Sequence, residues 1–188
     1  MIEIIIDNDI INGLRLCITQ QNSDIELSYF HLLDNKYSST ISRLDLNQSG
    51  FQHWYKSLVS DIIKQYLSSE RIVYSSVPST ICYFPNLQYY HCVSHPLCKN
   101  CHSVFLPLTQ WTESNTIRLK HKDETIPIGQ TINSCYIIAD NEDIIIPENH
   151  NLSNNTYFGL FFYIMSYQNY KSSMVYSSKN IGGFFSLL

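Results

Sequence analysis

The stretch "CYIIADNEDIII", residues 135–146, decides the fold class, because it places four polar residues between two short apolar runs. Both runs are rich in isoleucine, a β-branched residue that favours strands. Two such runs around a polar turn predict an antiparallel β-hairpin over residues 136–146. Runs of the same kind recur along the chain, so we expect antiparallel sheets to form much of the core.

The other expected strands follow the same rule: short apolar or alternating runs separated by residues typical of turns. They cover residues 2–6, 14–18, 25–29, 71–75, 80–84 and 116–120. Pro78 separates two of these runs, and Pro85 ends the second of them. Strands are therefore predicted in both halves of the chain.

Two segments are predicted to be helical. Residues 51–67 repeat apolar side chains at spacings of three and four, which gives one wide apolar stripe, and Ser49 and Gln52 form a capping box at its start. Residues 157–165 are almost all apolar or aromatic and follow Ser153-Asn154-Asn155, so they predict a second helix that is buried nearly all round. We therefore expect an α+β fold, with antiparallel sheets and a few packed helices.

The length of 188 residues and the hydrophobic share of 44% allow one domain or two small domains packed together. We expect residues 1–110 to form a strand-rich region with the amphipathic helix and a cysteine-bearing loop. Residues 111–188 are expected to hold the hairpin and the buried helix, packed on the first region.

Charge and hydropathy exclude two classes of partner. The net charge is -4, from 12 basic and 16 acidic residues with no basic cluster, which argues against nucleic-acid binding. No apolar run approaches the roughly 18 residues that span a membrane, and no signal region opens the sequence. We therefore expect a cytoplasmic protein, in which the six cysteines stay mostly as thiols.

Cys98 and Cys101, in "HPLCKNC" at residues 95–101, are the residues with the strongest chemical signature. A Cys-x-x-Cys pair supplies half of a tetrahedral zinc site. The other half would come from His91, Cys92, His95 or His102. Haem attachment would require export, and a redox pair would require a helix N-terminus after a strand, so both are weaker hypotheses. The segment itself favours a structural loop over a reaction centre.

No catalytic constellation stands out elsewhere. Asp7, Asp9, Glu142 and Asp143 fall in predicted turns, where solvated carboxylates are common, and no phosphate-binding loop occurs. No context singles out one thiol as a nucleophile. What remains favours recognition, because an exposed sheet edge captures an extended peptide through backbone hydrogen bonds. The alternative is that the many Tyr and Phe residues simply fill the core.

The order of strands, capped helix and cysteine-bearing "HPLCKNCH" (residues 95–102) resembles the C subunit of methanobactin biosynthesis, over the layout of the whole chain. The His-Pro-x-Cys-x-x-Cys element is also similar to parts of azole-forming cyclodehydratases, although these carry a second Cys-x-x-Cys that this chain lacks. Both families modify ribosomally made peptides.

The first resemblance implies a non-catalytic subunit that forms a heterodimer with a DUF692-type iron enzyme. It would bind the leader of a precursor peptide through a winged-helix-like sheet edge, and it would present the core cysteines to the iron of the partner for conversion to oxazolone and thioamide groups. This chain would then hold no cofactor. The residues expected to contact the peptide are Trp54, Tyr55, Leu58, Arg71, Val73 and Tyr74.

A second hypothesis stays open beside the first. The chain would be a small cytoplasmic zinc-binding protein, structural or regulatory, built around Cys98 and Cys101.

Overall fold

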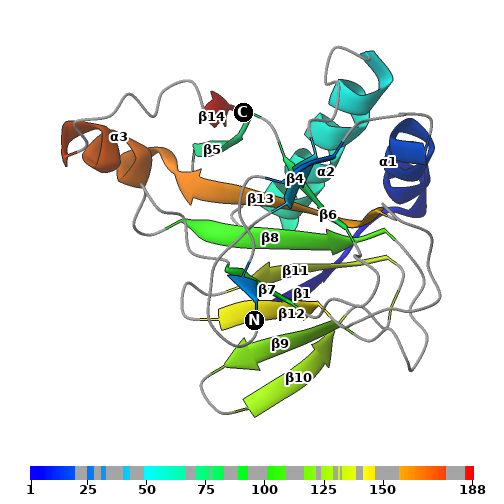
Figure 1. Ribbon diagram of the computed structural model, residues 1–188. Helices are drawn as coiled ribbons and strands as arrows, with labels where there is room; N and C mark the ends of the chain where they lie inside the picture. Colours follow the sequence, from blue (N-terminus) through cyan, green and yellow to red (C-terminus); the bar gives the residue numbers. More distant parts are fainter. Residues whose placement is uncertain are drawn as a thin grey trace.

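The computed structural model (Figure 1) describes residues 1–19, 25–27, 31–32, 40–42, 49–66, 71–76, 78–82, 89–92, 101–108, 117–121, 124–128, 131, 133–138, 142–146, 157–176 and 185–188. The helices in this part of the chain are α1 (Asn8–Thr19), α2 (Ser49–Tyr66) and α3 (Tyr167–Tyr176). The strands are β1 (Ile2–Ile5), β2 (Ile25–Leu27), β3 (His31–Leu32), β4 (Thr40–Ser42), β5 (Ile72–Ser75), β6 (Ser79–Cys82), β7 (Tyr89–Cys92), β8 (His102–Pro107), β9 (Ile117–His121), β10 (Glu124–Ile128), β11 (Ser134–Ile138), β12 (Glu142–Ile146), β13 (Tyr157–Ser166) and β14 (Phe185–Leu187).

Two antiparallel sheets organise these elements. The large sheet has the order β1-β11-β8-β13-β5-β14, with β6 also paired to β13, and the small sheet has the order β10-β9-β12-β7-β3. β2 and β4 pair separately as a two-stranded ribbon. The prediction of an α+β fold with antiparallel sheets and a few packed helices is confirmed.

Between β6 and β13 the chain moves back and forth between the two sheets. β6, β8, β11 and β13 belong to the large sheet, whereas β7, β9, β10 and β12 belong to the small one. Eight strands that alternate in this way between two antiparallel sheets form a jelly roll. Because the chain crosses between the sheets, residues that are distant in sequence lie together at the ends of the sandwich.

Helices α1 and α2 cover one face of the large sheet (Figure 1). Side chains from both helices and from this face form one buried apolar cluster, which includes Leu14, Leu58 and Phe162. The helices approach closely because Gly13 of α1 lies against the indole ring of Trp54, where a Cβ atom would overlap the ring. This layer buries the helix-facing side of the large sheet.

The opposite face of the large sheet packs on the small sheet, which lies below it in Figure 1. Phe105 and Phe161 project from this second face and are 0% and 1% exposed. Leu119 and Ile144 of the small sheet are both 0% exposed. None of the four belongs to the cluster under the helices, so the two sheets bury one another, as in a sandwich. We call the facing surfaces the inner face.

The predicted hairpin over residues 136–146 is wrong. β11 pairs with β1 and β8 in the large sheet, whereas β12 pairs with β7 and β9 in the small sheet. The two apolar runs are indeed strands, but the chain crosses from one sheet to the other between them. A local pattern of strand, polar turn and strand does not distinguish a hairpin from such a crossing.

Two further segments have the opposite secondary structure from the one predicted. Residues 14–18 lie in helix α1, whose inward side chains include Ile11 and Leu14, while Leu16 is 58% exposed. Residues 157–165 lie in strand β13, not in a helix. The uniform apolarity of β13 arises because helices cover one of its faces and the small sheet covers the other, and a strand buried on both faces shows no alternation.

The remaining predictions for secondary structure agree with the structure. Residues 51–67 correspond to helix α2, and the predicted strands at residues 2–6, 25–29, 71–75, 80–84 and 116–120 correspond to β1, β2, β5, β6 and β9. The predicted boundary between residues 1–110 and 111–188 runs through both sheets, since each sheet contains strands from both regions. None of the helices in the described residues is long and apolar enough to cross a membrane.

Candidate jelly-roll site

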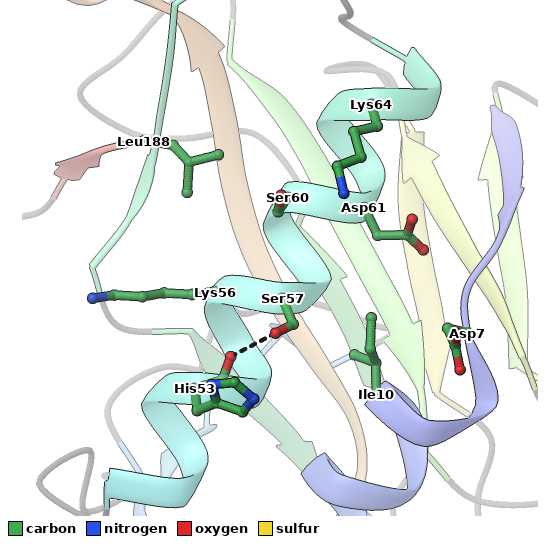
Figure 2. Close-up of a pocket in the computed structure, with 9 residues that line it drawn as sticks. All are labelled: Asp7, Ile10, His53, Lys56, Ser57, Ser60, Asp61, Lys64 and Leu188. Carbon is green, nitrogen blue, oxygen red and sulfur yellow. Dashed lines mark hydrogen bonds between the residues drawn. The ribbon is translucent and has the colours of Figure 1, made fainter.

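A groove on the outer surface follows the solvent-facing side of α2 (Figure 2). It has a volume of about 510 Å³, with the start of α1 on one side and the C-terminal residue on the other. The residues that line it are Asp7, Ile10, His53, Lys56, Ser57, Ser60, Asp61, Lys64 and Leu188.

The polar groups of this groove do not converge on one point. The Ser57 hydroxyl donates to the His53 carbonyl of its own helix at 3.0 Å, and Lys56 points away from the other side chains in Figure 2. The spacing of the α2 residues is that of the solvated face of an amphipathic helix. The groove therefore follows from the amphipathic pattern and brings together no acid, base and nucleophile.

Glu142, at the start of β12, is a buried carboxylate. It is 6% exposed, and its Oε1 lies 3.6 Å from the amino nitrogen of Met1. A carboxylate that loses its water must be compensated by a cation or by hydrogen bonds, because burial of an uncompensated charge costs many kcal/mol. Glu142 is therefore a charged side chain buried at the edge of the sandwich, where it needs a compensating partner.

The register of the small sheet places two histidine positions next to position 142. Glu142 is the register partner of His121, and Ile144 is the partner of both Leu119 and His91. Partners directly opposite one another in antiparallel strands share a face, and residues two apart in a strand share it as well. Since Leu119 and Ile144 lie on the inner face, positions 91, 121 and 142 fall on that face too.

The outer face of the same strands carries a different set of polar residues. Asp143 is the register partner of Lys120 and Cys92, and therefore lies on the face opposite to Glu142. Asp143 and Lys120 are both half-buried. Asp143 is thus a matched control for Glu142, since it is an acidic neighbour with the opposite orientation.

The large sheet contributes two polar side chains at the same end of the sandwich. Ser103 pairs with Ile138, the last residue of β11, and with Tyr163 of β13. Ser103 is 0% exposed, while Tyr163 is half-buried with its ring edge-on to Phe161 at a centroid distance of 5.2 Å. We call this end, where β7, β9 and β11 finish and β8 and β12 begin, the open end of the jelly roll.

The residues predicted to bind a peptide lie elsewhere, mostly in the core. Tyr55, Leu58, Val73 and Tyr74 are between 0% and 4% exposed. β5 pairs with β13 on one edge and with β14 on the other, so it offers no free edge to a peptide. The winged-helix-like binding element predicted around Arg71 and Tyr74 is therefore not formed by β5.

The other two predicted contacts are more accessible. Trp54 is half-buried against Gly13, and Arg71 is exposed. The Arg71 carbonyl accepts a hydrogen bond from the Tyr167 amide at 2.7 Å, which ties β5 to the start of α3. Both residues take part in joining secondary structure elements.

Tyr55 shows why a helical tyrosine is held inside the core. Its hydroxyl donates to the Ser75 carbonyl at 2.7 Å, and its ring lies edge-on to those of Tyr74 and Phe162. Burial raises the pKa of Tyr55 well above its ordinary value, and the nearby Tyr74 raises it further. The side chain is therefore a neutral hydrogen-bond donor that links α2 to β5.

Of the two cysteines predicted to hold zinc, Cys98 lies outside the described residues. Cys101 is 3% exposed and packs with Val73 and Met165. Among the side chains that the structure describes, which do not include those of His91 and His121, no group of three or more His, Cys, Asp or Glu gathers to hold a metal ion. Cys101 thus faces an apolar cluster.

Of the three candidate residues on the small sheet, only His91 was named from the sequence, as a possible zinc ligand beside Cys98 and Cys101. Glu142 was assigned to a solvated turn, yet it is the first residue of β12. The sequence did contain one usable signal. Ile117, Leu119 and His121 alternate along one strand, so the pattern that places Ile117 and Leu119 on the inner face places position 121 on it too. The pairing of β12 with β7 and β9 was not predictable from local patterns.

No protein-family model matches the chain, and no curated protein matches it. Among solved structures, one match is to the crystal structure of a prolyl-4-hydroxylase from Pseudomonas putida. The match has a TM-score of 0.49 and 12% sequence identity, and it covers 88% of this chain and 84% of that one.

These findings correct the resemblance to the methanobactin C subunit, which is wrong: the match is to a hydroxylase over most of both chains. The predictions derived from that resemblance are corrected with it, namely a non-catalytic role, a leader-binding function and iron held only by a partner. The zinc site at Cys98 and Cys101 is not retained either. The DUF692-type partner and the absence of a nucleic-acid partner stay predictions that no contact in the described structure tests.

Proposed function

We propose that this protein is an iron-dependent oxygenase whose metal is held at the open end of the jelly roll by His91, His121 and Glu142. Two histidines and one carboxylate with open positions are the ligand set of non-haem Fe(II) oxygenases. The observation that carries the proposal is the register of the small sheet, which puts these three positions on the inner face beside one another.

The spacing of the three positions suits a shared ion. Glu142 and His121 are directly opposite one another, where Cβ atoms lie about 4.5–5.5 Å apart, and His91 is on the diagonal from Glu142, at about 7–8 Å. Glu142 is thus a neighbour of both histidine positions, and the three residues would hold the ion with Glu142 between the two histidines. The buried carboxylate also fits, because a divalent cation offsets the cost of its desolvation.

A bound ferrous ion would supply the activation of dioxygen. The chain itself would supply the ligands, an apolar layer that excludes water, and polar groups on the sheet that faces the ion. Phe105 and Phe161, both fully buried between the two sheets, would form this apolar layer. The Ser103 hydroxyl and the half-buried Tyr163 ring lie on the facing sheet, where they would orient a substrate.

The test is spectroscopic and needs no substrate. The chain is loaded with one equivalent of Fe(II) without oxygen, nitric oxide is added as a surrogate for dioxygen, and electron paramagnetic resonance is recorded. We expect an iron–nitric oxide signal in the wild type, lost in Glu142→Ala and in His121→Ala. The Asp143→Asn variant is the control and should keep the signal, because this side chain lies on the other face.

Equal signals from the wild type, Glu142→Ala and His121→Ala would contradict the proposal. So would a wild-type signal no larger than that of iron in buffer. In either case Glu142 would be only the counter-ion of the amino group that it contacts.

A further inference from the structure

Three tyrosines gather at the open end of the jelly roll, where β13 passes into α3. We call Tyr163, Tyr167 and Tyr170 the tyrosine cluster. All three are half-buried and pack on a small buried group formed by Val73, Cys101 and Met165. Sulfur atoms at a ring edge favour such packing. One side of the cluster is therefore fixed against the protein while the other remains accessible.

The start of α3 holds the cluster in place. The Ser166 hydroxyl accepts a hydrogen bond from the Asn169 amide at 3.2 Å, which is the contact of a helix N-cap. The Tyr167 amide donates to the Arg71 carbonyl at 2.7 Å. Figure 1 shows α3 at the end of the β13 arrow, on the side where β11 also ends. The rings are thus positioned by the cap and by β5.

The exposed side of the cluster already binds a cation from the same chain. The rings of Tyr167 and Tyr170 are stacked, with centroids 6.2 Å apart and planes inclined by 26°. The Lys171 ammonium lies 4.8 Å from the centroid of the Tyr167 ring. A cation over an aromatic face at this distance is attracted by the π electrons. Lys171 itself is exposed and can move away.

We propose that the tyrosine cluster docks a Lys or Arg side chain of a peptide substrate at the open end. The proposal rests on the proposed oxygenase function and names its substrate class. Lys171 acts as an internal stand-in that the substrate cation displaces. No acidic residue occurs in β5, β13 or α3, so the aromatic faces themselves would provide the attraction for the cation. Tyr163, which belongs to both the cluster and the inner face, connects the docking surface with the proposed iron site.

The test is peptide binding by the full chain without metal, so that its outcome is separate from that of the iron proposal. A fluorescently labelled peptide of ten residues with three lysines is compared, by anisotropy, with the same peptide in which the lysines are acetylated or replaced by glutamate. We expect the lysine peptide to bind and the other two to bind at least about five-fold more weakly.

Variants locate the binding surface. Lys171→Met removes the internal competitor and should tighten binding of the lysine peptide by about two- to five-fold. Tyr167→Leu should weaken it by a similar factor, whereas Tyr167→Phe keeps the aromatic face and should not. Tyr66→Leu is the control, since Tyr66 is also half-buried but contacts His102 on the opposite face of the large sheet.

Several results would overturn the proposal. One is equal binding of the lysine, acetylated and glutamate peptides, and another is no binding by any of them. Binding unchanged in Lys171→Met would also contradict it, and this exposed substitution leaves the fold intact. Failure of peptide binding together with a normal iron signal would reject the docking surface alone.

Discussion

The two faces of the large sheet differ in what they bury. The face under α1 and α2 is covered by an apolar cluster in which Tyr55 and Tyr74 are the main polar tips. The inner face buries Phe105 and Phe161 as well, but it also carries Ser103 and Ser134, and the facing strand β12 carries Glu142. The Ser134 hydroxyl is buried and has no hydrogen-bond partner among the residues that the structure describes.

This contrast indicates a division of roles. A face filled with apolar side chains maximises stability, because each buried side chain contributes about 1.5–3 kcal/mol. An interior that buries the Glu142 carboxylate, which pairs with the Met1 amino group, and the unsatisfied Ser134 hydroxyl accepts a cost in stability. Such a cost is common where polar groups serve binding or catalysis.

The largest expected effect is on the helix-covered face. Phe162→Ala removes a ring that is 1% exposed and that contacts Tyr55, so it should lower the free energy of unfolding by about 3–5 kcal/mol. Urea denaturation followed by circular dichroism measures this. Leu187→Ala is the control, since Leu187 is 53% exposed and should change stability by less than about 0.5 kcal/mol. Similar losses of stability in both variants would contradict the expected difference between a buried and an exposed apolar side chain.

A smaller effect is expected where the two helices touch. Gly13→Ala places a Cβ atom into the indole of Trp54 and should destabilise the protein by about 1–3 kcal/mol. Gly50→Ala is the matched control, because its Cβ would lie 3.5 Å from the Cys17 sulfur, an ordinary contact. The second substitution should be neutral or stabilise by up to about 1 kcal/mol, as alanine favours helices. Thermal unfolding distinguishes them, and a harmless Gly13→Ala would show that the helices can separate.

The smallest effect is in alkaline solution. Burial raises the pKa of Tyr55 in the folded state, so above pH about 10 the unfolded chain loses this proton first. The stability contributed by neutral Tyr55 is complete below that pH and is lost as the pH rises further. Stability should therefore fall more steeply with pH in the wild type than in Tyr55→Phe, which also loses the bond to Ser75, worth about 1 kcal/mol.

Parallel pH dependences in the two proteins between pH 9 and about pH 11 would contradict this account of Tyr55. Tyr74 contributes in the same direction, because burial raises its pKa too. It is present in both proteins and cancels in the comparison.

The sequence predicted the elements whose local pattern matches their burial. Helix α2 has one buried and one solvated side, so its period was clear. The segment that forms helix α1 was predicted as a strand because Leu14, Leu16 and Ile18 alternate, whereas its buried side chains Ile11 and Leu14 are three residues apart, as on one face of a helix. Strand β13 was missed because burial on both faces removes the period on which the prediction depends.

The site was less predictable than the fold. Its three proposed ligands come from β7, β9 and β12, which lie side by side only because the chain crosses between sheets. The hairpin prediction kept residues 136–146 in one sheet and therefore turned Glu142 into a solvated turn residue. Only the alternation that leads to His121 was present in the sequence itself.

Equilibrium dialysis of Fe(II) against the chain under nitrogen tests the central claim most directly. We predict one ion per chain in the wild type and in Asp143→Asn, and affinity reduced by at least about 100-fold in His91→Ala, His121→Ala and Glu142→Ala. Circular dichroism of each variant would confirm that it is folded. Wild-type affinity in all three folded variants, or no bound iron in the wild type, would contradict the account.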